Sequence, residues 1–532
     1  MYRNNRAGQL SFKDFYLPFS GKLSGENRWV TLSELIPWEK FENEYAEQFS
    51  EGIGAPAKPF RMALGALIIK ERLGTSDEET VEQIRENPYL QYFIGLSEYS
   101  NEAPFEASMM VHFRKRLNLE IVGRINEEIA KGKERTSNPV KAEEKKDRDE
   151  PLKPPAEKTI AQVKTVNAEE KGEQASPAKE EVAANKGQLL LDASCAPADI
   201  RYPTDLSLLN QAREQTEAII DDLYKQVDLE QKPRTYREQA RKRYLQVAKQ
   251  RRASGKVIRK AIRTQLGYVR RNLAHIDTLI AAGASLSELS RQRYRRLLVV
   301  SELMRQQQWI YDQNMRRIDD RIVSLAQPHV RPIVRGKAGT PVEFGAKIAV
   351  SCVDGKVFLE RLSWDNFNES VDLPEQVESY RIRFGYYPKS LHVDQIYRTK
   401  LNRAYCKERG IRISGSPLGR PKKDEKEQAA LRKQTLEDIG VRNQIEGKFG
   451  QGKRRFSLGL IKSKLAETAE TSIAITFLVM NLEHLLRPFF VFWANVLIYW
   501  RFFSNIKVCK LKILKNCYRL LEIYLPNKIL FQ

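Results

Sequence analysis

A long charged stretch in the first half of the chain cannot fold by itself and divides the protein into parts. From about 131 to 187 the sequence consists largely of Lys, Glu, Pro and Ala, with almost no aromatic residues. Such a composition buries too little apolar surface to offset the entropy lost on ordering the chain. We therefore predict a disordered charged linker over 131–187, with folded units on both sides.

The residues before the linker indicate a helical unit over 1–130. Pro59–Leu73 is apolar with helical spacing, and S-D-E-E-T from Ser76 is a capping residue followed by acids in the first turn. In Ser108–Leu117 an apolar stripe adjoins Arg114, Lys115 and Arg116. That segment is either a DNA-contacting helix or the solvated face of a core helix.

The region 205–327 is predicted to be helical and is strongly basic. Between Lys232 and Arg296 there are 19 Lys and Arg residues against three acids, a local excess of 16. Leucines and isoleucines at helical spacing predict a hairpin or bundle of helices. Its default role is sequence-independent contact with phosphates, although such an arm could serve RNA as readily as DNA.

Alternation of apolar and polar residues begins after Pro328. Phe344–Val353 and Lys356–Leu362 are predicted strands joined by Asp354-Gly355, a two-residue hairpin signal. A helix over Leu373–Phe384, a strand over Ser390–Asp394 and a helix over about 426–465, broken near Gly440 and the later glycines, are expected to follow. Upstream, Gln188–Asp192 (QLLLD) indicates a buried strand with its carboxylate at the tip.

Bulk composition limits the class of protein further. The chain has 532 residues, which is too many for one core, and 90 Lys+Arg against 68 Asp+Glu give a net charge of +22, which favours a polyanionic partner. The five cysteines, Cys195, Cys352, Cys406, Cys509 and Cys517, form no C-x-x-C pair, which predicts free thiols in a reducing cytoplasm. The N-terminus has no secretory signal pattern. The uncharged run 488–500 is shorter than the roughly 20 residues of a spanning helix, so a buried or partner-covered helix is favoured over an interfacial segment.

Three carboxylates stand out as candidates for chemistry on DNA. Asp192 and Asp394 end predicted strands, and Glu446 lies on a predicted helix. Two divalent cations held by converging carboxylates serve phosphodiester cleavage and strand transfer well, and Mg²⁺ prefers oxygen ligands. Each acid alone is more often a cap or turn residue. His392 should share the face of Asp394 by period two and is a candidate for positioning the site.

The surroundings of Glu446 are more specific. Arg442, Glu446 and Lys453 stand at i, i+4 and i+11, which places them on one helical face. A carboxylate between two cations can hold metal while the cations take phosphates. The alternative is an exposed Arg-Glu pair of small energetic value. Gly447, Gly450 and Gly452 favour the first interpretation, because glycines weaken a helix unless something must approach closely.

These segments together resemble the DDE transposases of bacterial insertion sequences. The resemblance covers the helical N-terminal region from about Leu32 to Leu117, both aspartate segments, the strand block between them and RNQIEGKFGQGKRRFSLGLIKSKLAET. The third-carboxylate motif of that family is similar to Y-x2-R-x3-E-x6-K. Arg442, Glu446 and Lys453 match it at the family spacing, whereas Ile439 stands where the family has tyrosine.

The resemblance implies an α/β fold, an RNase H-like mixed five-stranded sheet with flanking helices, preceded by a helical N-terminal domain and interrupted by a long basic helical insertion. It implies that Asp192, Asp394 and Glu446 hold Mg²⁺ or Mn²⁺, two ions in all, and that Arg442 and Lys453 position DNA phosphates. Expected partners are terminal inverted repeats, target DNA and a second copy of the chain, in the cytoplasm with the nucleoid. The expected domains are 1–130, the linker 131–187, a catalytic domain of 188–204 and 328–487, the insertion 205–327 and a tail 488–532.

Two other functions compete with an active transposase. A domesticated or decayed transposase would bind DNA through the same fold without cutting it. An RNA-binding or RNA-processing protein built on the basic helices is a weaker alternative, because the sequence has no aromatic-rich motif of the kind that stacks bases.

Overall fold

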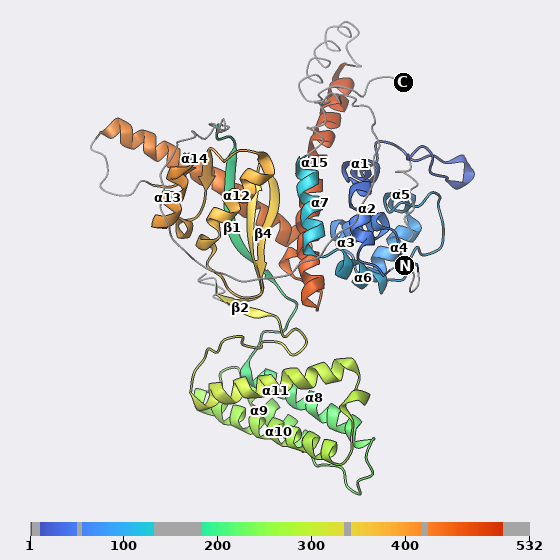
Figure 1. Ribbon diagram of the computed structural model, residues 1–532, viewed down its shortest axis with the longest axis vertical. Helices are drawn as coiled ribbons and strands as arrows, with labels where there is room; N and C mark the ends of the chain where they lie inside the picture. Colours follow the sequence, from blue (N-terminus) through green and yellow to red (C-terminus); the bar gives the residue numbers. More distant parts are fainter. Residues whose placement is uncertain are drawn as a thin grey trace, which may run out of the picture.

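The structure is a computed structural model that describes residue 2 and residues 11–50, 56–131, 184–334, 342–416 and 424–503; the side chains of Phe19 and of 488–503 are not among the described parts. Figure 1 shows a helical N-terminal unit, a sheet with helices around it, and a bundle of helices set apart from both. Most of the predicted linker 131–187 and the predicted tail beyond 503 lie outside the described residues.

The N-terminal unit is built from short helices around an apolar core. Its helices are α1 (Arg28–Leu35), α2 (Trp38–Ala46), α3 (Phe60–Leu73), α4 (Asp77–Glu86), α5 (Pro88–Phe93), α6 (Met109–Arg116) and α7 (Leu119–Lys131). The predicted helix over Pro59–Leu73 is confirmed as α3, whose apolar residues are buried except for Leu73 at its end. The predicted cap is confirmed as well, because the Ser76 hydroxyl accepts the backbone N–H of Glu79 at the start of α4.

Helix α6 is not simply a solvated basic face. The Arg114 side chain is buried and donates to Asp77 with an Nη1–Oδ1 distance of 3.1 Å, so its charge is used inside the unit. Arg116 donates to the backbone oxygen of Gln48 and lies over the Phe49 ring. Only Lys115 of the three predicted basic residues is fully exposed. Arg114 can be buried because Asp77 pairs with it. Without that pair, the free energy lost when the guanidinium leaves water would not be recovered.

Six strands form one mixed sheet. The sheet is five strands wide, because two of the six strands pair with the same edge of a third. The strands are β1 (Gln188–Pro197), β2 (Arg331–Val334), β3 (Val342–Val353), β4 (Lys356–Ser363), β5 (Ser390–His392) and β6 (Arg412–Ile413). Their order is β2-β3-β1-β5-β6, and β4 pairs with a different stretch of the same edge of β3 as β2. The β1–β3 and β3–β4 pairs are antiparallel, whereas β5 is parallel to β1 and β6 is parallel to β5.

The predicted hairpin is confirmed between β3 and β4. Asp354 and Gly355 both have positive φ, 49° and 77°, which is the turn that matches the twist of paired strands. A Cβ on Gly355 would lie 2.6 Å from the His484 ring, so glycine is required there for space as well as for conformation.

Asp192 does not end its strand as predicted. β1 continues to Pro197, and Asp192 is paired with Val350 of β3 within the strand. The strand outlasts its predicted end because β3 goes on pairing with it as far as Gly345. On the other side of β1 the pairing with β5 stops at Leu190, which leaves Asp192 at the open edge beyond β5.

The basic region is a four-helix bundle inserted between β1 and β2. Its helices are α8 (Asp205–Tyr224), α9 (Arg237–Ala248), α10 (Gly255–Ala281) and α11 (Arg291–Asp312). Leu209, Val269 and Leu303 are fully buried where α8, α10 and α11 meet. The prediction of a helical bundle at this place is confirmed, because apolar stripes on three helices face one another.

Helices flank the sheet, and one of them differs from the prediction. α12 (Leu373–Phe384) has the predicted bounds, and α13 (Lys400–Glu408) follows β5. α14 runs from Glu425 to Arg455 without interruption, so the predicted break near Gly440 and the predicted end near 465 are both wrong. The glycines do not interrupt the helix, because the residues around them continue its backbone hydrogen bonding. It ends at Phe456, where the chain becomes extended and leads to the 3₁₀ turn Ser457–Gly459.

The long helix α15 (Ala466–Phe503) joins the N-terminal unit to the sheet. It packs on α3, α6 and α7 on one side and on β4 on the other, as Figure 1 shows. Residues 488–500, predicted to form a buried helix, belong to α15, although their side chains lie outside the described part. In the described part of the chain, no helix is long and apolar enough to cross a membrane.

A buried pair of asparagines fixes this junction. Asn481 of α15 donates to the Val357 oxygen and to Asn126 Oδ1 of α7, each at 2.8 Å, and accepts the Val357 N–H at 2.8 Å. Asn126 donates to the same Val357 oxygen at 3.1 Å. Helices from both ends of the chain are thereby hydrogen-bonded to one strand residue of the sheet.

Replacing Asn481 should therefore loosen the junction. Asn481→Ala leaves a buried strand N–H without its acceptor and Asn126 with a partner fewer, and we expect it to lower the free energy of unfolding by about 2–4 kcal/mol. Urea denaturation measures the loss. Asn443→Ala, on the exposed surface of α14, is the matched control and should change stability little. Equal effects of the two substitutions would contradict the role of the pair.

Candidate active site

The parallel pairing of β1 and β5 sets two aspartates at the same level. Leu190 and His392 are the last residues paired between these strands, and Asp192 and Asp394 each stand two residues further along. Asp394 then begins the 3₁₀ turn Gln395–Tyr397. Both carboxylates therefore lie just beyond the point where the parallel pairing of β1 and β5 ends, Asp192 within β1 and Asp394 after the end of β5.

Helix α14 brings the third carboxylate and its arginine to this edge. Arg442 Nη1 lies 3.0 Å from Asp394 Oδ1, and Arg442 Nη2 lies 3.1 Å from Glu446 Oε1. The side chains of Asp394 and Glu446 are 59% and 53% exposed, so both can be reached from solvent. One guanidinium thus bridges two of the predicted catalytic acids, which lie 52 positions apart in the sequence.

Asp192 is half-buried and is the least exposed of the three carboxylates. Burial raises its pKa to about 6, and the backbone N–H of Ala193, 2.8 Å from Oδ1, opposes that rise. The charges of Asp394 and Glu446 raise the pKa further, while Arg442 lowers it. The four side chains predicted to act together therefore share one electrostatic field, although Asp192 makes no direct contact with Arg442 among the described interactions.

The shifted pKa of Asp192 has a consequence for stability. Because the folded pKa is about 6 and the ordinary value is 3.8, the ionised carboxylate destabilises the fold as pH rises through 6. In EDTA, Asp192→Asn should stabilise the protein by on the order of 1–2 kcal/mol at pH 7.5, and this gain should shrink between pH 6 and pH 4. Thermal unfolding across this range measures it.

Asp394→Asn is the control for that experiment, because it removes a neighbouring carboxylate that is mostly exposed. It keeps the Asp192 carboxylate, so the dependence of stability on pH that Asp192 contributes should remain. A gain for Asp192→Asn that is constant from pH 4 to pH 7.5 would contradict the burial of this charge.

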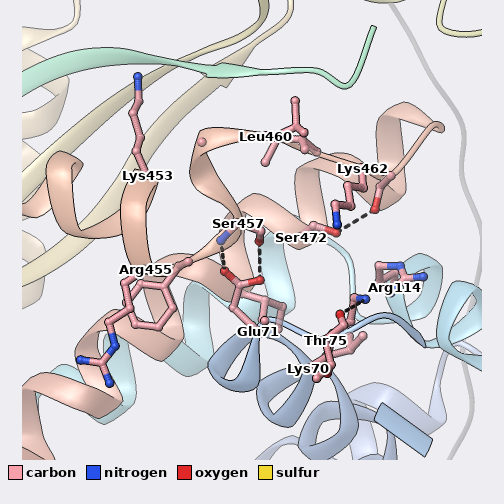
Figure 2. Close-up of a pocket in the computed structure, with 17 residues that line it drawn as sticks. Lys70, Glu71, Thr75, Arg114, Lys453, Arg455, Ser457, Leu460, Lys462 and Ser472 are labelled. Carbon is pink, nitrogen blue, oxygen red and sulfur yellow. Dashed lines mark hydrogen bonds between the residues drawn. The ribbon is translucent and has the colours of Figure 1, made fainter. Parts of the chain in front are cut away.

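Lys453 lies further along the same helix. It follows Glu446 by seven residues, which is about two turns, and so keeps to the same face of α14. In Figure 2 its side chain extends away from the other labelled residues and toward the end of β1. It lines a cleft of about 520 Å³ between the N-terminal unit and the end of α14, together with Lys70, Arg455 and Lys462.

A hydrogen-bonded acid holds the floor of this cleft. Glu71 of α3 accepts the backbone N–H of Ser457 at 2.9 Å and the hydroxyl of Thr476 at 2.7 Å, and it also accepts the Ser457 hydroxyl (Figure 2). The N-terminal unit thus holds the turn that ends α14. Gly452 packs in the same region, where a Cβ would lie 2.9 Å from Leu458, so its role is packing and not the predicted approach of phosphate. A Cβ on Gly447, beside Glu446, would meet nothing within 4 Å.

The structure places His392 away from the carboxylate edge. It is 1% exposed, its Nε2 lies 3.0 Å from the Ser390 hydroxyl, and its Nδ1 lies 3.6 Å from Asp438 Oδ1 of α14. Residues two apart, such as His392 and Asp394, lie on one face only as long as the strand continues. β5 ends at His392, so the rule does not apply to this pair. Burial lowers the pKa of His392, although Asp438 opposes that change.

Asp438 and Arg412 form a clamp that the sequence did not reveal. Arg412 of β6 donates to both carboxylate oxygens of Asp438, each at 2.8 Å. Burial would raise the pKa of Asp438, but the hydrogen bonds and charge of Arg412 hold it below its ordinary value. This clamp fixes α14 against the strands one turn before Arg442. Arg412 lies in a two-residue strand and Asp438 on a polar helix, so no local pattern signals the pair.

We expect Asp438→Asn to weaken both the fold and the site. It removes a bidentate charged pair whose acid is 8% exposed, which should lower the free energy of unfolding by about 1–3 kcal/mol. Denaturation by urea measures this change. Glu302→Gln, in the exposed pair with Arg305 on α11, is the control and should leave the unfolding midpoint unchanged. If both variants unfold at the same urea concentration, the clamp does not stabilise the fold and the prediction is wrong.

No ready-made metal cluster is formed by the described side chains. In the ranges that the structure describes, no three His, Cys, Asp or Glu side chains lie close enough together to hold an ion. Asp394 and Glu446 are instead both paired with the guanidinium of Arg442. The cysteines within the described range, Cys195, Cys352 and Cys406, are buried free thiols, as predicted.

Two segments of the chain match known protein families. Residues 391–483, which hold Asp394, Glu446 and α14, match the family described as transposase DDE domain. Residues 18–116 match the family described as transposase domain (DUF772). Two segments of the chain, residues 18–116 and 391–483, are thus each similar to a transposase domain. DDE domains catalyse phosphoryl transfer on DNA.

A curated protein is also similar over a short region. The uncharacterized protein ORF8 in the nfe locus of Rhizobium meliloti is 40% identical over 88 residues, which is 16% of this chain and 42% of the relative. The chain thus spans less than half of that relative's length. No solved structure matches the chain.

Proposed function

We propose that this protein is a transposase that cuts and joins DNA at the ends of an insertion sequence, with Asp192, Asp394 and Glu446 as its catalytic carboxylates. The observation that supports this most strongly is the meeting of β1, β5 and α14. Two aspartates stand level on adjacent parallel strands, and Arg442 joins one of them to Glu446. The matches to two transposase families at both ends of the chain agree with it.

The catalytic domain is proposed to be RNase H-like. Its sheet has an antiparallel series, β1, β3 and β4, followed by β5 and β6 parallel to β1, in the spatial order β4-β3-β1-β5-β6. This is the mixed five-stranded arrangement that the resemblance implies, and β2 extends the outer edge of β3. The proposed domains are those of the sequence: 1–130, 188–204 with 328–487, the insertion 205–327, the linker 131–187 and the tail 488–532.

The donor chemistry of the three carboxylates suits Mg²⁺ or Mn²⁺, two ions in the proposal, although among the described residues they do not form a ready-made metal cluster. Burial is the main cause of the raised pKa of Asp192, and the charges of Asp394 and Glu446, which add to it, support a place for a cation beside these acids. Bound to Asp192, Asp394 and Glu446, the ions would supply the Lewis acidity that assists attack on a phosphodiester and departure of the leaving oxygen.

The chain's own cations would place the DNA. Arg442 is 24% exposed and now holds two carboxylates, so it can exchange one of them for a phosphate oxygen. Lys453 extends toward the end of β1 from the same face of α14. Gly447 leaves open space beside Glu446, where a strand of DNA can approach the helix closely.

The proposed partners follow from this chemistry. They are the terminal inverted repeats, target DNA, and a second copy of the chain on DNA, in the cytoplasm with the nucleoid. A net charge of +22 favours a polyanionic partner in general. The competing function, a DNA-binding protein that has lost catalysis, keeps the same fold and is separated from the first by experiment.

Cleavage of a duplex that carries the element's own ends tests the proposal. In Mg²⁺ or Mn²⁺ the wild type should cut it, and Asp192→Asn, Asp394→Asn and Glu446→Gln should each reduce the rate by roughly two orders of magnitude or more. DNA binding, measured in parallel by fluorescence anisotropy, should persist in all three variants.

One control variant and two alternative outcomes make the result decisive. Glu437→Gln removes an exposed acid from the same helix and should cut like the wild type. A wild type that binds the ends but never cuts them would favour the non-catalytic function. Cutting that survives the loss of any of the three carboxylates would remove that residue from the site.

A further inference from the structure

The inserted bundle contains a second cleft that the proposed catalytic site does not use. It lies between α9 and α10 and has a volume of about 510 Å³, within the range of about 300–1,000 Å³ for ligand sites. Arg243 of α9 and Lys260, Arg263 and Arg271 of α10 line it, together with Tyr236 and Tyr268. Lys260, Arg263, Gly267 and Arg271 stand at i, i+3, i+7 and i+11, so they form one stripe along α10.

The charges in this cleft are not compensated. No acid lines it, and within the described residues none of its four cations forms an ion pair. Other cations of the bundle differ, because Lys232 and Arg237 pair with Asp221, and Arg293 pairs with Asp222. Four like charges facing one small space destabilise the bundle unless an anion neutralises them.

The walls of the cleft are held in place. Gln265 of α10 is buried and donates to the Ala240 oxygen of α9 at 3.2 Å. Arg271 lies over two tyrosine rings, with its Cζ 4.9 Å from the centre of Tyr236 and 5.6 Å from that of Tyr268. Cation–π contacts of this kind orient a guanidinium without neutralising it. Gly267 leaves open space on the α10 wall.

Tyr236 is held in an unusual conformation at the rim. It precedes α9 with φ 53° and ψ 32°, the left-handed region that a bulky residue rarely adopts, and its side chain is 39% exposed. Strained residues gather at binding sites, where the surrounding structure holds them in place. The ring contacts both Arg234, at 4.8 Å, and Arg271, and so organises the cations beside it.

We propose that the cleft between α9 and α10 binds the sugar–phosphate backbone of DNA, with Arg243, Lys260 and Arg263 on phosphate oxygens and Arg271 held in register by Tyr236 and Tyr268. The insertion is then a second DNA-binding site, separate from the carboxylate edge. Because the assigned contacts are to phosphate oxygens and not to base edges, we expect binding there to be independent of sequence. The inference rests on the proposed function in taking DNA as the polyanion.

The test compares two variants of the full chain that lose the same charge. The cleft variant is Arg243→Gln with Lys260→Gln and Arg263→Gln. The control variant is Arg241→Gln with Lys242→Gln and Lys249→Gln, which removes three exposed cations from a different face of α9. Binding to a labelled duplex with the element's ends, and to an unrelated duplex of equal length, is measured over a range of salt concentrations.

The cleft variant should lose affinity for both duplexes equally. Its plot of log affinity against log salt should be less steep by about 2–3, because each phosphate contact contributes about 0.9 to that slope. The control variant should change the slope by less than 1. Equal changes in the two variants would overturn the proposal, since they would show a general effect of charge. Loss of affinity for the element's ends alone would also overturn it.

Tyr236→Asn separates binding from folding. Asparagine tolerates the left-handed conformation, so the melting temperature should not fall, while DNA affinity should drop several-fold as Arg271 loses its ring contact. Unchanged affinity would overturn the assigned role of Tyr236.

The two proposals can fail independently. A wild type that cuts DNA while the cleft variant binds like the control removes the second site and leaves the proposed function. A wild type that never cuts, but whose binding depends on the cleft, keeps the site and removes the catalytic function.

Discussion

The parallel pairing of β1 and β5, which sets Asp192 and Asp394 at the same level just beyond its last pair, is the constraint on which the rest of the site depends. Asp192 and Asp394 can lie together only because β1 and β5 pair in one register, Leu190 opposite His392. Like charges at such a place repel, and burial of Asp192 adds to the cost. The fold tolerates this cost because Arg442 joins the same field and because both strands are held by neighbours on their other sides.

The helix that completes the site is held near its middle and at its C-terminal end. The Asp438–Arg412 clamp fixes α14 to the strands before Arg442. Beyond Lys453, Glu71 of the N-terminal unit holds Ser457. The position of Glu446 therefore depends on a strand of the sheet and on a helix near the beginning of the chain. The N-terminal unit and the sheet each supply part of the frame for α14.

Charge is distributed in two distinct ways over the protein. Around α14 and α15, cations are paired with acids, as Arg72 and Arg455 are with Glu483, and they strengthen the frame. In the inserted bundle, the cations of the α9–α10 cleft face one another without acids. Paired charges stabilise the folded chain by themselves, whereas unpaired like charges require a counterion or a polyanionic ligand. The paired cations therefore have a structural role, and the unpaired cations of the cleft have the proposed binding role.

The sequence by itself determined the elements whose signals are local. Apolar spacing predicted α3 and α12, Asp354-Gly355 predicted the β3–β4 hairpin, and the i, i+4 spacing of Arg442 and Glu446 predicted the pair that the structure contains. These signals extend over one turn of helix or one hairpin, where backbone geometry alone decides which side chains meet.

Only the tertiary structure decided which polar residues are buried and with what partners. His392 was expected beside Asp394 but packs on Asp438, because β5 ends before period two can apply. Arg114 was expected on a surface stripe but is buried against Asp77. α14 was expected to break at its glycines but continues. Each of these outcomes depends on contacts between segments far apart in the chain, and the free energy of such contacts is absent from any local pattern of residues.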